Sequence, residues 1–151
     1  QTAQVKWRYT LEQPADGWIQ PGFDDSAWME GVGGFGTQGT PGALIGTEWN
    51  TKQIWLRREF TLPEGPLKNP RLLLIYDEDP EVYLNGELAT KLTGWTGTYE
   101  ETDIAPAALA TLKPGRHGMA VHASQTWGGQ SIDVGIVEEG EPTARSAADP
   151  P

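Results

Sequence analysis

The sequence contains no cysteine among its 151 residues, so disulfide bonds and thiolate metal sites are excluded. It also has no apolar run of transmembrane length and no hydrophobic segment typical of a signal peptide. Basic residues are scarce, because 11 lysines and arginines stand against 21 aspartates and glutamates, for a net charge of −10. Nucleic acids and heavily sulfated glycans require clustered positive charge. The expected partners therefore include neither nucleic acid nor membrane, and neutral polar ligands or cations fit better.

The chain length suits one domain that buries enough apolar surface to fold without covalent cross-links. Nineteen glycines and twelve prolines indicate many turns and argue against a helical bundle. A short helix is expected at Asp103–Leu112, with Asp103 as its cap. The clearest expected strands are Trp7–Leu11, Ile54–Leu62, Leu72–Tyr76, Glu81–Asn85, Arg116–Ser124 and Ser131–Glu138. This pattern predicts an all-β fold, namely a β-sandwich, and within that class a jelly roll.

The most informative stretch is Arg71–Gly86, with the sequence RLLLIYDEDPEVYLNG. An apolar strand ends at an acidic corner, Asp77–Asp79, and a second strand ends on Asn85–Gly86. The Asn-Gly pair is typical of a type I′ hairpin turn, because both residues tolerate a positive φ. Three carboxylates between two apolar runs are costly unless they are solvated or have partners. The corner is therefore either a solvated turn or part of a binding site.

The C-terminal residues Gly140–Pro151 are poor in apolar side chains and rich in proline, alanine and serine. Such a composition is typical of a disordered tail or an interdomain linker. We expect a domain over residues 1–139, followed by this segment over residues 140–151. A module taken from a larger protein would have this organisation.

The motifs of the chain together resemble one family, the galactose-binding-like β-sandwich. This domain is a type of carbohydrate-binding module and occurs as a sugar-binding or ancillary domain in many glycoside hydrolases. The resemblance spans roughly Trp18 to Val137. It rests on the order of five motifs: FDDSxW, WLRREF, DEDPEVYLNG, LKPGRHGMAVH and GGQSIDVGI. It implies a jelly-roll sandwich without catalytic residues, joined to a catalytic domain in the same polypeptide. It also implies a secreted or cell-surface bacterial protein.

Sugar recognition combines an aromatic face, which stacks on the C–H face of the ring, with polar side chains that bind hydroxyl groups. Three tryptophans lie in loops with glycine or polar neighbours and are candidate stacking residues: Trp49, Trp95 and Trp127. The polar candidates are Asp77, Glu78, Arg57 and Gln130. Trp7, Trp28 and Trp55 are expected in the core. Whether the candidate loops share one end of the sandwich is a hypothesis, because jelly-roll crossings break the alternation of ends.

Catalysis and metal binding have weaker support. A glycosidase needs two carboxylates facing one cleft, and nothing in the spacing pairs the acidic residues in this way. Asp24–Asp25 and the acidic corner could offer oxygen ligands to a structural Ca²⁺, but EF-hand spacing is absent. His117 and His122 would lie on opposite faces of a strand, which disfavours zinc. We therefore expect no catalytic residue and no cofactor, and expect His122 to bond to Asp133 or Gln130.

These observations lead to two main hypotheses, beside a third and weaker one in which the same loops form a protein–protein adhesion module. In the first, the chain is a non-catalytic carbohydrate-binding module that targets an attached glycoside hydrolase to a neutral or weakly charged polysaccharide. In the second, it is a structural β-sandwich spacer that packs against a catalytic domain without binding glycan. The exposure of the loop tryptophans distinguishes the two, since only a binding module needs an aromatic face open to solvent.

Overall fold

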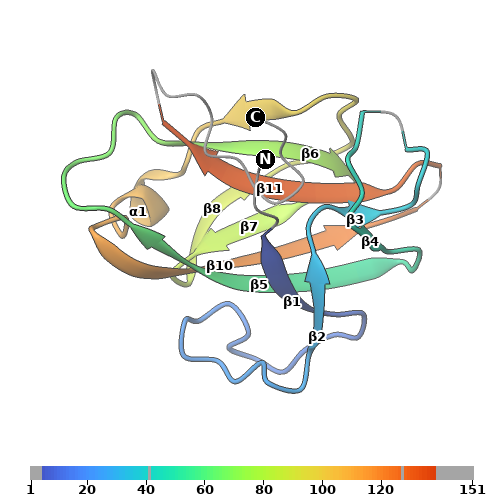
Figure 1. Cartoon of the computed structure of the whole chain (residues 1–151), viewed down its shortest axis with the longest axis horizontal. Coiled ribbons are helices and arrows are strands. Elements are labelled where there is room, and N and C mark those ends of the chain that lie inside the picture. The colour runs from blue at the N-terminus through green and yellow to red at the C-terminus, as the bar shows by residue number, and fades with distance from the viewer. Residues whose placement is uncertain (1–4, 41, 127, 139–151) are drawn as a thin grey trace.

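The computed structural model describes residues 5–40, 42–126 and 128–138, which form two facing β-sheets (Figure 1). The first sheet has six strands in the order β2 (Met29–Val32), β1 (Lys6–Thr10), β5 (Gln53–Leu62), β10 (Gly115–Ser124), β7 (Glu81–Leu84) and β8 (Glu87–Lys91). The second has five strands in the order β4 (Thr47–Glu48), β3 (Phe35–Gly36), β11 (Ser131–Val137), β6 (Arg71–Asp77) and β9 (Glu100–Thr102). The predicted all-β sandwich is confirmed, while the jelly-roll subtype stays a prediction.

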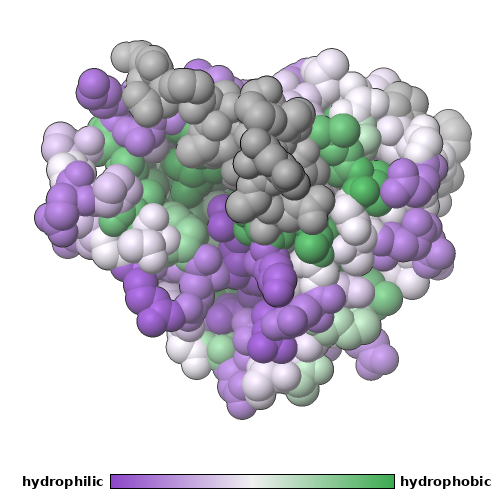
Figure 2. Space-filling model, in the orientation of Figure 1, coloured by the Kyte–Doolittle hydropathy of each residue, from purple (hydrophilic) through white to green (hydrophobic). Residues whose placement is uncertain are grey.

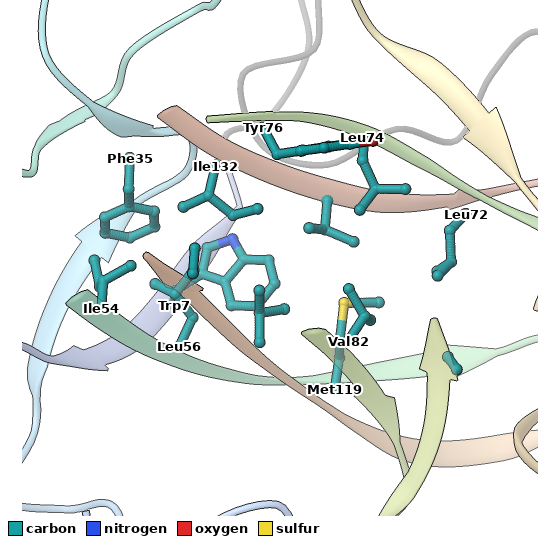
Figure 3. Packing of buried hydrophobic residues seen from close by; sticks show 14 of the residues in the cluster. Trp7, Phe35, Ile54, Leu56, Leu72, Leu74, Tyr76, Val82, Met119 and Ile132 are labelled. Atoms are coloured by element: carbon teal, nitrogen blue, oxygen red, sulfur yellow. The ribbon is translucent and has the colours of Figure 1, made fainter. Parts of the chain in front are cut away.

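The hydrophobic core lies between the two sheets and follows from the alternation of side chains along the strands. In β5, Ile54 and Leu56 point into the core, and in β11 Ile132 and Val134 face them from the other sheet. Figure 3 shows the indole of Trp7 lying among these apolar side chains. Burying each large apolar side chain stabilises the fold by about 2 kcal/mol, so this layer is the main source of stability.

Strand β6 is buried on both of its faces, which explains its unbroken apolar sequence. Leu72, Leu74 and Tyr76 belong to the core, whereas Leu73 and Ile75 are buried on the outer side of the five-stranded sheet. A methyl group placed on Gly42 would lie 3.3 Å from the Ile75 side chain, so the loop containing Gly42 passes over this face. The strand is thus held from both sides up to its last residue.

The acidic corner is the point where the chain crosses from one sheet to the other. It follows β6 in the five-stranded sheet and leads into β7 in the six-stranded sheet. The backbone of Glu78 exchanges two hydrogen bonds with Ser124 at the end of β10, at 2.7 and 3.0 Å. The corner is therefore fixed to both sheets at one end of the sandwich.

The hairpin predicted at Asn85–Gly86 is confirmed. Both residues have positive φ, +52° and +84°, and they connect the antiparallel strands β7 and β8. The Asn85 side chain also accepts a hydrogen bond from the backbone N–H of Gly118 at 2.9 Å. The turn is thereby joined to the neighbouring strand β10.

The described helix α1 (Pro106–Leu109) is shorter than the predicted segment Asp103–Leu112. Asp103 does not cap it, because its carboxylate lies 3.4 Å from the Arg71 guanidinium instead. The N-cap position is occupied by Ala105, which offers no side-chain acceptor. No described helix has the length and apolar character needed to cross a membrane.

Figure 2 shows hydrophobic residues in separate patches between hydrophilic ones on the visible face. The large apolar residues that are most exposed, Met29, Leu44, Leu88, Trp95 and Leu109, come from different parts of the chain. Among them Trp95 stands out, because 68% of its surface is accessible to solvent whereas none of the others exceeds 47%. Such exposure of a tryptophan is unusual for a residue with only a packing role.

Candidate functional site

A pocket of about 380 Å³ lies at the end of the sandwich where β6 finishes. Four separate segments form it, and Figure 1 shows the loops that contain them gathered at the right-hand end of the sheets. The described residues that line the pocket are Thr40, Asp77, Glu78, Trp95, Thr96, Gly97, Gly128 and Gly129. The pocket therefore joins the acidic corner to the most exposed tryptophan among the described residues.

Trp95 is placed by backbone pairing beside the last residue of β6. Asp77 and Trp95 form an antiparallel β-bridge, and the Thr96 N–H donates to the Tyr76 carbonyl at 2.8 Å. The Tyr76 N–H in turn donates to the Thr96 hydroxyl oxygen at 3.2 Å. The segment at Trp95 thus extends the sheet locally, which holds the indole next to the acidic corner while its ring stays open to solvent.

Two carboxylates of the corner are used to hold loops together. One oxygen of Glu78 accepts hydrogen bonds from the backbone N–H and the hydroxyl of Thr126. One oxygen of Asp79 accepts a hydrogen bond from the Gly94 N–H at 2.6 Å. These contacts connect the corner to the loops on both sides of the pocket, so the two residues have structural roles.

Asp77 differs from its neighbours because its carboxylate has no hydrogen-bond or ion-pair partner among the described residues. Partial burial and, to a smaller extent, the negative charge of Glu78 together raise the pKa of Asp77 to about 6. A pocket residue of this kind is a candidate for function rather than for structure, since its environment destabilises its charged form.

The floor of the pocket is open because residue 129 is a glycine. A methyl group at Gly129 would lie 3.2 Å from the Thr40 methyl carbon and 3.3 Å from an Asp77 carboxylate oxygen. The Thr40 hydroxyl donates to the Gln130 carbonyl and accepts from the Gln130 N–H, both at 3.1 Å. Thr40 is therefore fixed in place, and the space between it and Asp77 remains free for a ligand group.

The structure brings three of the predicted site residues together: Asp77, Glu78 and Trp95 all line the pocket. Gln130 is next to it but is buried, and its amide donates to the Thr51 carbonyl at 2.6 Å. It supports the loop rather than facing the pocket. Trp127 lies outside the described residues. Sequence reasoning missed Thr40, Thr96 and Gly129, for which the only available signal was their place in glycine-rich loops.

The interpretation of Trp49 as a ligand-facing residue is wrong, because only 1% of its surface is exposed and it belongs to the core. The cause is the parallel pairing of β4 with β3, after which the Trp49 N–H donates to the Gly36 carbonyl at 2.8 Å. This pairing turns the indole inward. The glycine and polar residues around it in the sequence gave no sign of this long-range contact.

Arg57 does not line this pocket, and its role in ligand binding stays a prediction. Its guanidinium donates to the Asp25 carboxylate at 2.9 Å and to the backbone carbonyls of Trp18, Gln20 and Phe23. Arg57 is buried on the outer face of the six-stranded sheet, beneath the loop that contains these partners. It holds that loop in place.

The partner predicted for His122 is wrong as well. His122 Nε2 lies 2.7 Å from the Gln53 Oε1, and the ring stacks on Trp55 with centroids 4.9 Å apart. Asp133 belongs to the other sheet, where its carboxylate accepts a hydrogen bond from the Tyr99 hydroxyl at 2.6 Å. Burial lowers the pKa of His122, although nearby Glu81 acts in the opposite direction.

The acidic pair Asp24–Asp25, considered as a source of Ca²⁺ ligands, is engaged in contacts within its own loop and with Arg57. Hydrogen bonding by the Ser26 side chain, and then by the Ser26 N–H at 3.0 Å, lowers the pKa of Asp24, and Asp25 is bound to Arg57. Within the described ranges, no group of three or more histidine, aspartate or glutamate side chains is placed to hold a metal ion.

No protein-family model matches the chain. It is 28% identical over 145 residues to an α-L-rhamnosidase of Streptomyces avermitilis, an alignment that covers 83% of this chain and 12% of that protein. Among solved structures, a β-glycosidase from Bacteroides vulgatus has a TM-score of 0.56 at 18% identity, covering 89% of this chain and 20% of the other. A glycosyl hydrolase family 2 member from Bacteroides cellulosilyticus has a TM-score of 0.59 at 15% identity, covering 88% and 20%.

These similarities confirm, at the level of fold, the resemblance to the β-sandwich domains found in glycoside hydrolases. A β-glucuronidase from glycoside hydrolase family 2 adds a TM-score of 0.58 at 18% identity, covering 83% of this chain and 14% of that one. The chain thus spans between about an eighth and a fifth of the length of these proteins. It matches a small part of larger glycoside hydrolases.

Proposed function

We propose that the chain is a non-catalytic carbohydrate-binding module that holds an attached glycoside hydrolase on a neutral or weakly charged polysaccharide. The observation that carries the proposal is the pocket in which the exposed indole of Trp95 stands beside the unpartnered carboxylate of Asp77. A sugar ring matches this pair, because it has an apolar C–H face for the indole and hydroxyl groups for the carboxylate.

The two groups have complementary roles in the proposed site. Stacking on Trp95 removes apolar surface of both the ring and the indole from water. Hydrogen bonds from sugar hydroxyls to Asp77 are charge-assisted and fix the orientation of the ring. Because the pocket is open to solvent, the expected free energy of binding is modest, about −8 to −4 kcal/mol, or micromolar to millimolar affinity.

The proposed module acts as part of a larger enzyme. We propose that the chain is joined to a catalytic domain in the same polypeptide and works outside the cell, either secreted or on the cell surface. A module of this kind raises the local concentration of substrate around the catalytic domain without breaking bonds. Because the chain is similar to part of an α-L-rhamnosidase, L-rhamnose and rhamnose-containing glycans are the first ligands to examine.

Affinity electrophoresis tests the proposal with rhamnose-containing polysaccharides, galactan, agar, xylan and glucan. We expect retardation of the wild type by at least one of them. We expect Trp95→Ala to weaken that interaction about tenfold or more, as removal of a central aromatic anchor does. Leu109→Ala is the control, since Leu109 is another exposed apolar residue but lies on α1, away from the pocket. Absence of retardation by every glycan would contradict the proposal.

The alternative function is that of a spacer domain that packs against a catalytic neighbour. It is favoured by the small share of the related proteins that the chain represents. Tryptophan fluorescence separates the two functions. A binding module gives a sugar-dependent change in emission that disappears in Trp95→Phe, whereas a spacer gives no change with any sugar.

A further inference from the structure

From the charges and free hydrogen-bonding groups of the pocket, we infer that it recognises a sugar unit through two neighbouring hydroxyl groups that donate hydrogen bonds, and that it rejects sugars carrying a carboxylate or sulfate. This inference rests on the proposed function and narrows its ligand class. It goes beyond stacking, because an exposed indole by itself accepts the C–H faces of neutral and acidic sugars alike.

The first argument is the inventory of side-chain groups that remain free to bind a ligand. The Thr40 hydroxyl is used by the Gln130 backbone, and one Glu78 oxygen is used by Thr126. What remains is the Asp77 carboxylate, the second Glu78 oxygen, the proton of the Thr96 hydroxyl and the indole N–H of Trp95. Carboxylate oxygens therefore dominate, and they only accept hydrogen bonds. A pair of adjacent sugar hydroxyls complements them.

The second argument is the absence of a positive charge among the described lining residues of the pocket. Lys52 lies near this end of the sandwich, where its carbonyl accepts the Gln125 N–H, but it does not line the pocket. Arg57 and Arg71 are engaged by carboxylates elsewhere. A carboxylate or sulfate on the ligand would thus face Asp77 and Glu78 without a counter-charge, and such juxtaposition is strongly unfavourable.

The third argument is the shape of the floor. A methyl group at position 129 would occupy the space between Thr40 and Asp77, 3.2 Å from the Thr40 methyl carbon and 3.3 Å from an Asp77 oxygen. A hydroxyl group can enter this space and reach the carboxylate. Gly129 has no positive φ, so an alanine there changes the space without imposing a strained backbone. Gly129→Ala is therefore a steric test of access to Asp77.

The charge state of Asp77 gives the rejection a characteristic pH dependence. With a pKa of about 6, Asp77 is ionised at pH 7.5 and mostly neutral at pH 5. Glu78 is the charged side chain beside it in the pocket. Rejection of an acidic sugar should accordingly be stronger at pH 7.5 than at pH 5, whereas an uncharged site would show no such difference.

Isothermal titration of wild type, Asp77→Asn, Gly129→Ala and Trp95→Ala with L-rhamnose, methyl galactoside and methyl galactosiduronate tests the inference. We expect the wild type to bind a neutral sugar at least about tenfold more tightly than the uronate at pH 7.5, with a smaller ratio at pH 5. Asp77→Asn should reduce the ratio at pH 7.5. Gly129→Ala should weaken binding of the neutral sugar. Gly22→Ala, where no atom lies within 4 Å of the added methyl, should leave its binding unchanged.

Methylation of the neighbouring hydroxyls of the neutral sugar should also abolish binding. The inference is overturned if the uronate binds as tightly as the neutral sugar, or if neither pH nor Asp77→Asn changes their ratio. In both cases a carbohydrate-binding function survives. Failure of every sugar to bind would instead remove the proposed function itself, so the two failures are distinguishable.

Discussion

A carboxylate without a partner lowers the stability of a folded protein when burial removes part of its hydration. Asp77 is such a group, since its pKa is raised from 3.8 to about 6 by burial and by Glu78. The folded state therefore binds this proton more tightly than the unfolded state does. The contribution of Asp77 to the free energy of unfolding is therefore most favourable below pH 4. It falls as the pH rises from about 4 to 6 and is constant at higher pH.

Replacing this carboxylate should stabilise the fold while weakening the site. We expect Asp77→Asn to raise the free energy of unfolding at pH 7.5 by less than about 1 kcal/mol after solvent screening, or about 2 °C in Tm. It should also flatten the pH dependence between 4 and 6. Thermal melts at several pH values measure both effects.

Asp79→Asn is the control, because its amide oxygen can still accept the Gly94 N–H and its φ of +45° suits asparagine. It should change neither the Tm nor the pH profile. A loss of stability in Asp77→Asn would mean that Asp77 has a structural role.

At the scale of elements, Arg57 on β5 illustrates how one side chain can hold a long irregular segment. Four of its hydrogen bonds reach a loop that has no regular secondary structure of its own between Trp18 and Asp25. Phe23 also lies under the Arg57 guanidinium, 5.2 Å from it. The loop is therefore ordered by a strand residue rather than by its own sequence.

Arg57→Met should destabilise the domain by about 3 kcal/mol, because Asp25 and three carbonyl groups lose their donor. Chemical denaturation measures this loss, and hydrogen exchange should show it first in residues 18–25. The affinity for glycan should stay unchanged, since the pocket is built from other segments.

Arg116→Met is the matched control. Its partner Glu59 and Arg116 itself are both exposed, so loss of that ion pair should cost under about 0.5 kcal/mol. Equal destabilisation by the two substitutions would show that burial does not decide the strength of the Arg57 contacts.

At the scale of the molecule, the sandwich gathers loops from distant parts of the sequence at one end. Thr40, Asp77, Trp95 and Gly129 become neighbours only because β3, β6 and β11 lie side by side in one sheet. The exposed apolar residues elsewhere on the described surface are dispersed. The whole chain has a net charge of −10. The proposed site therefore exists only in the folded domain, at the end where these loops meet.

In an intact glycoside hydrolase that contains this domain, Trp95→Ala should lower activity on a polymeric substrate but leave activity on a small soluble glycoside unchanged. The physical reason is that targeting matters only when the substrate is a polymer that the module can also bind. Parallel assays with the two substrates measure the difference. Equal activity of the variant and the wild type on the polymer would favour the spacer function.

Several features could be predicted from the sequence because they depend on neighbours along the chain. The apolar run of β6 indicated a strand, and Asn85–Gly86 specified a turn through its backbone preferences. The acidic corner was identified as well, although its division into two structural carboxylates and one free carboxylate was not.

What the sequence alone determined was the all-β class, the main strands, the acidic corner and the presence of tryptophans in the loops. Only the tertiary structure decided which of these residues share a site. The parallel pairing of β3 with β4 turned Trp49 into the core. Arg57 forms its hydrogen bonds with a loop that is distant in the sequence. The reason is that side-chain alternation is a local property, whereas exposure depends on which segments cover each face, and that is decided by long-range packing.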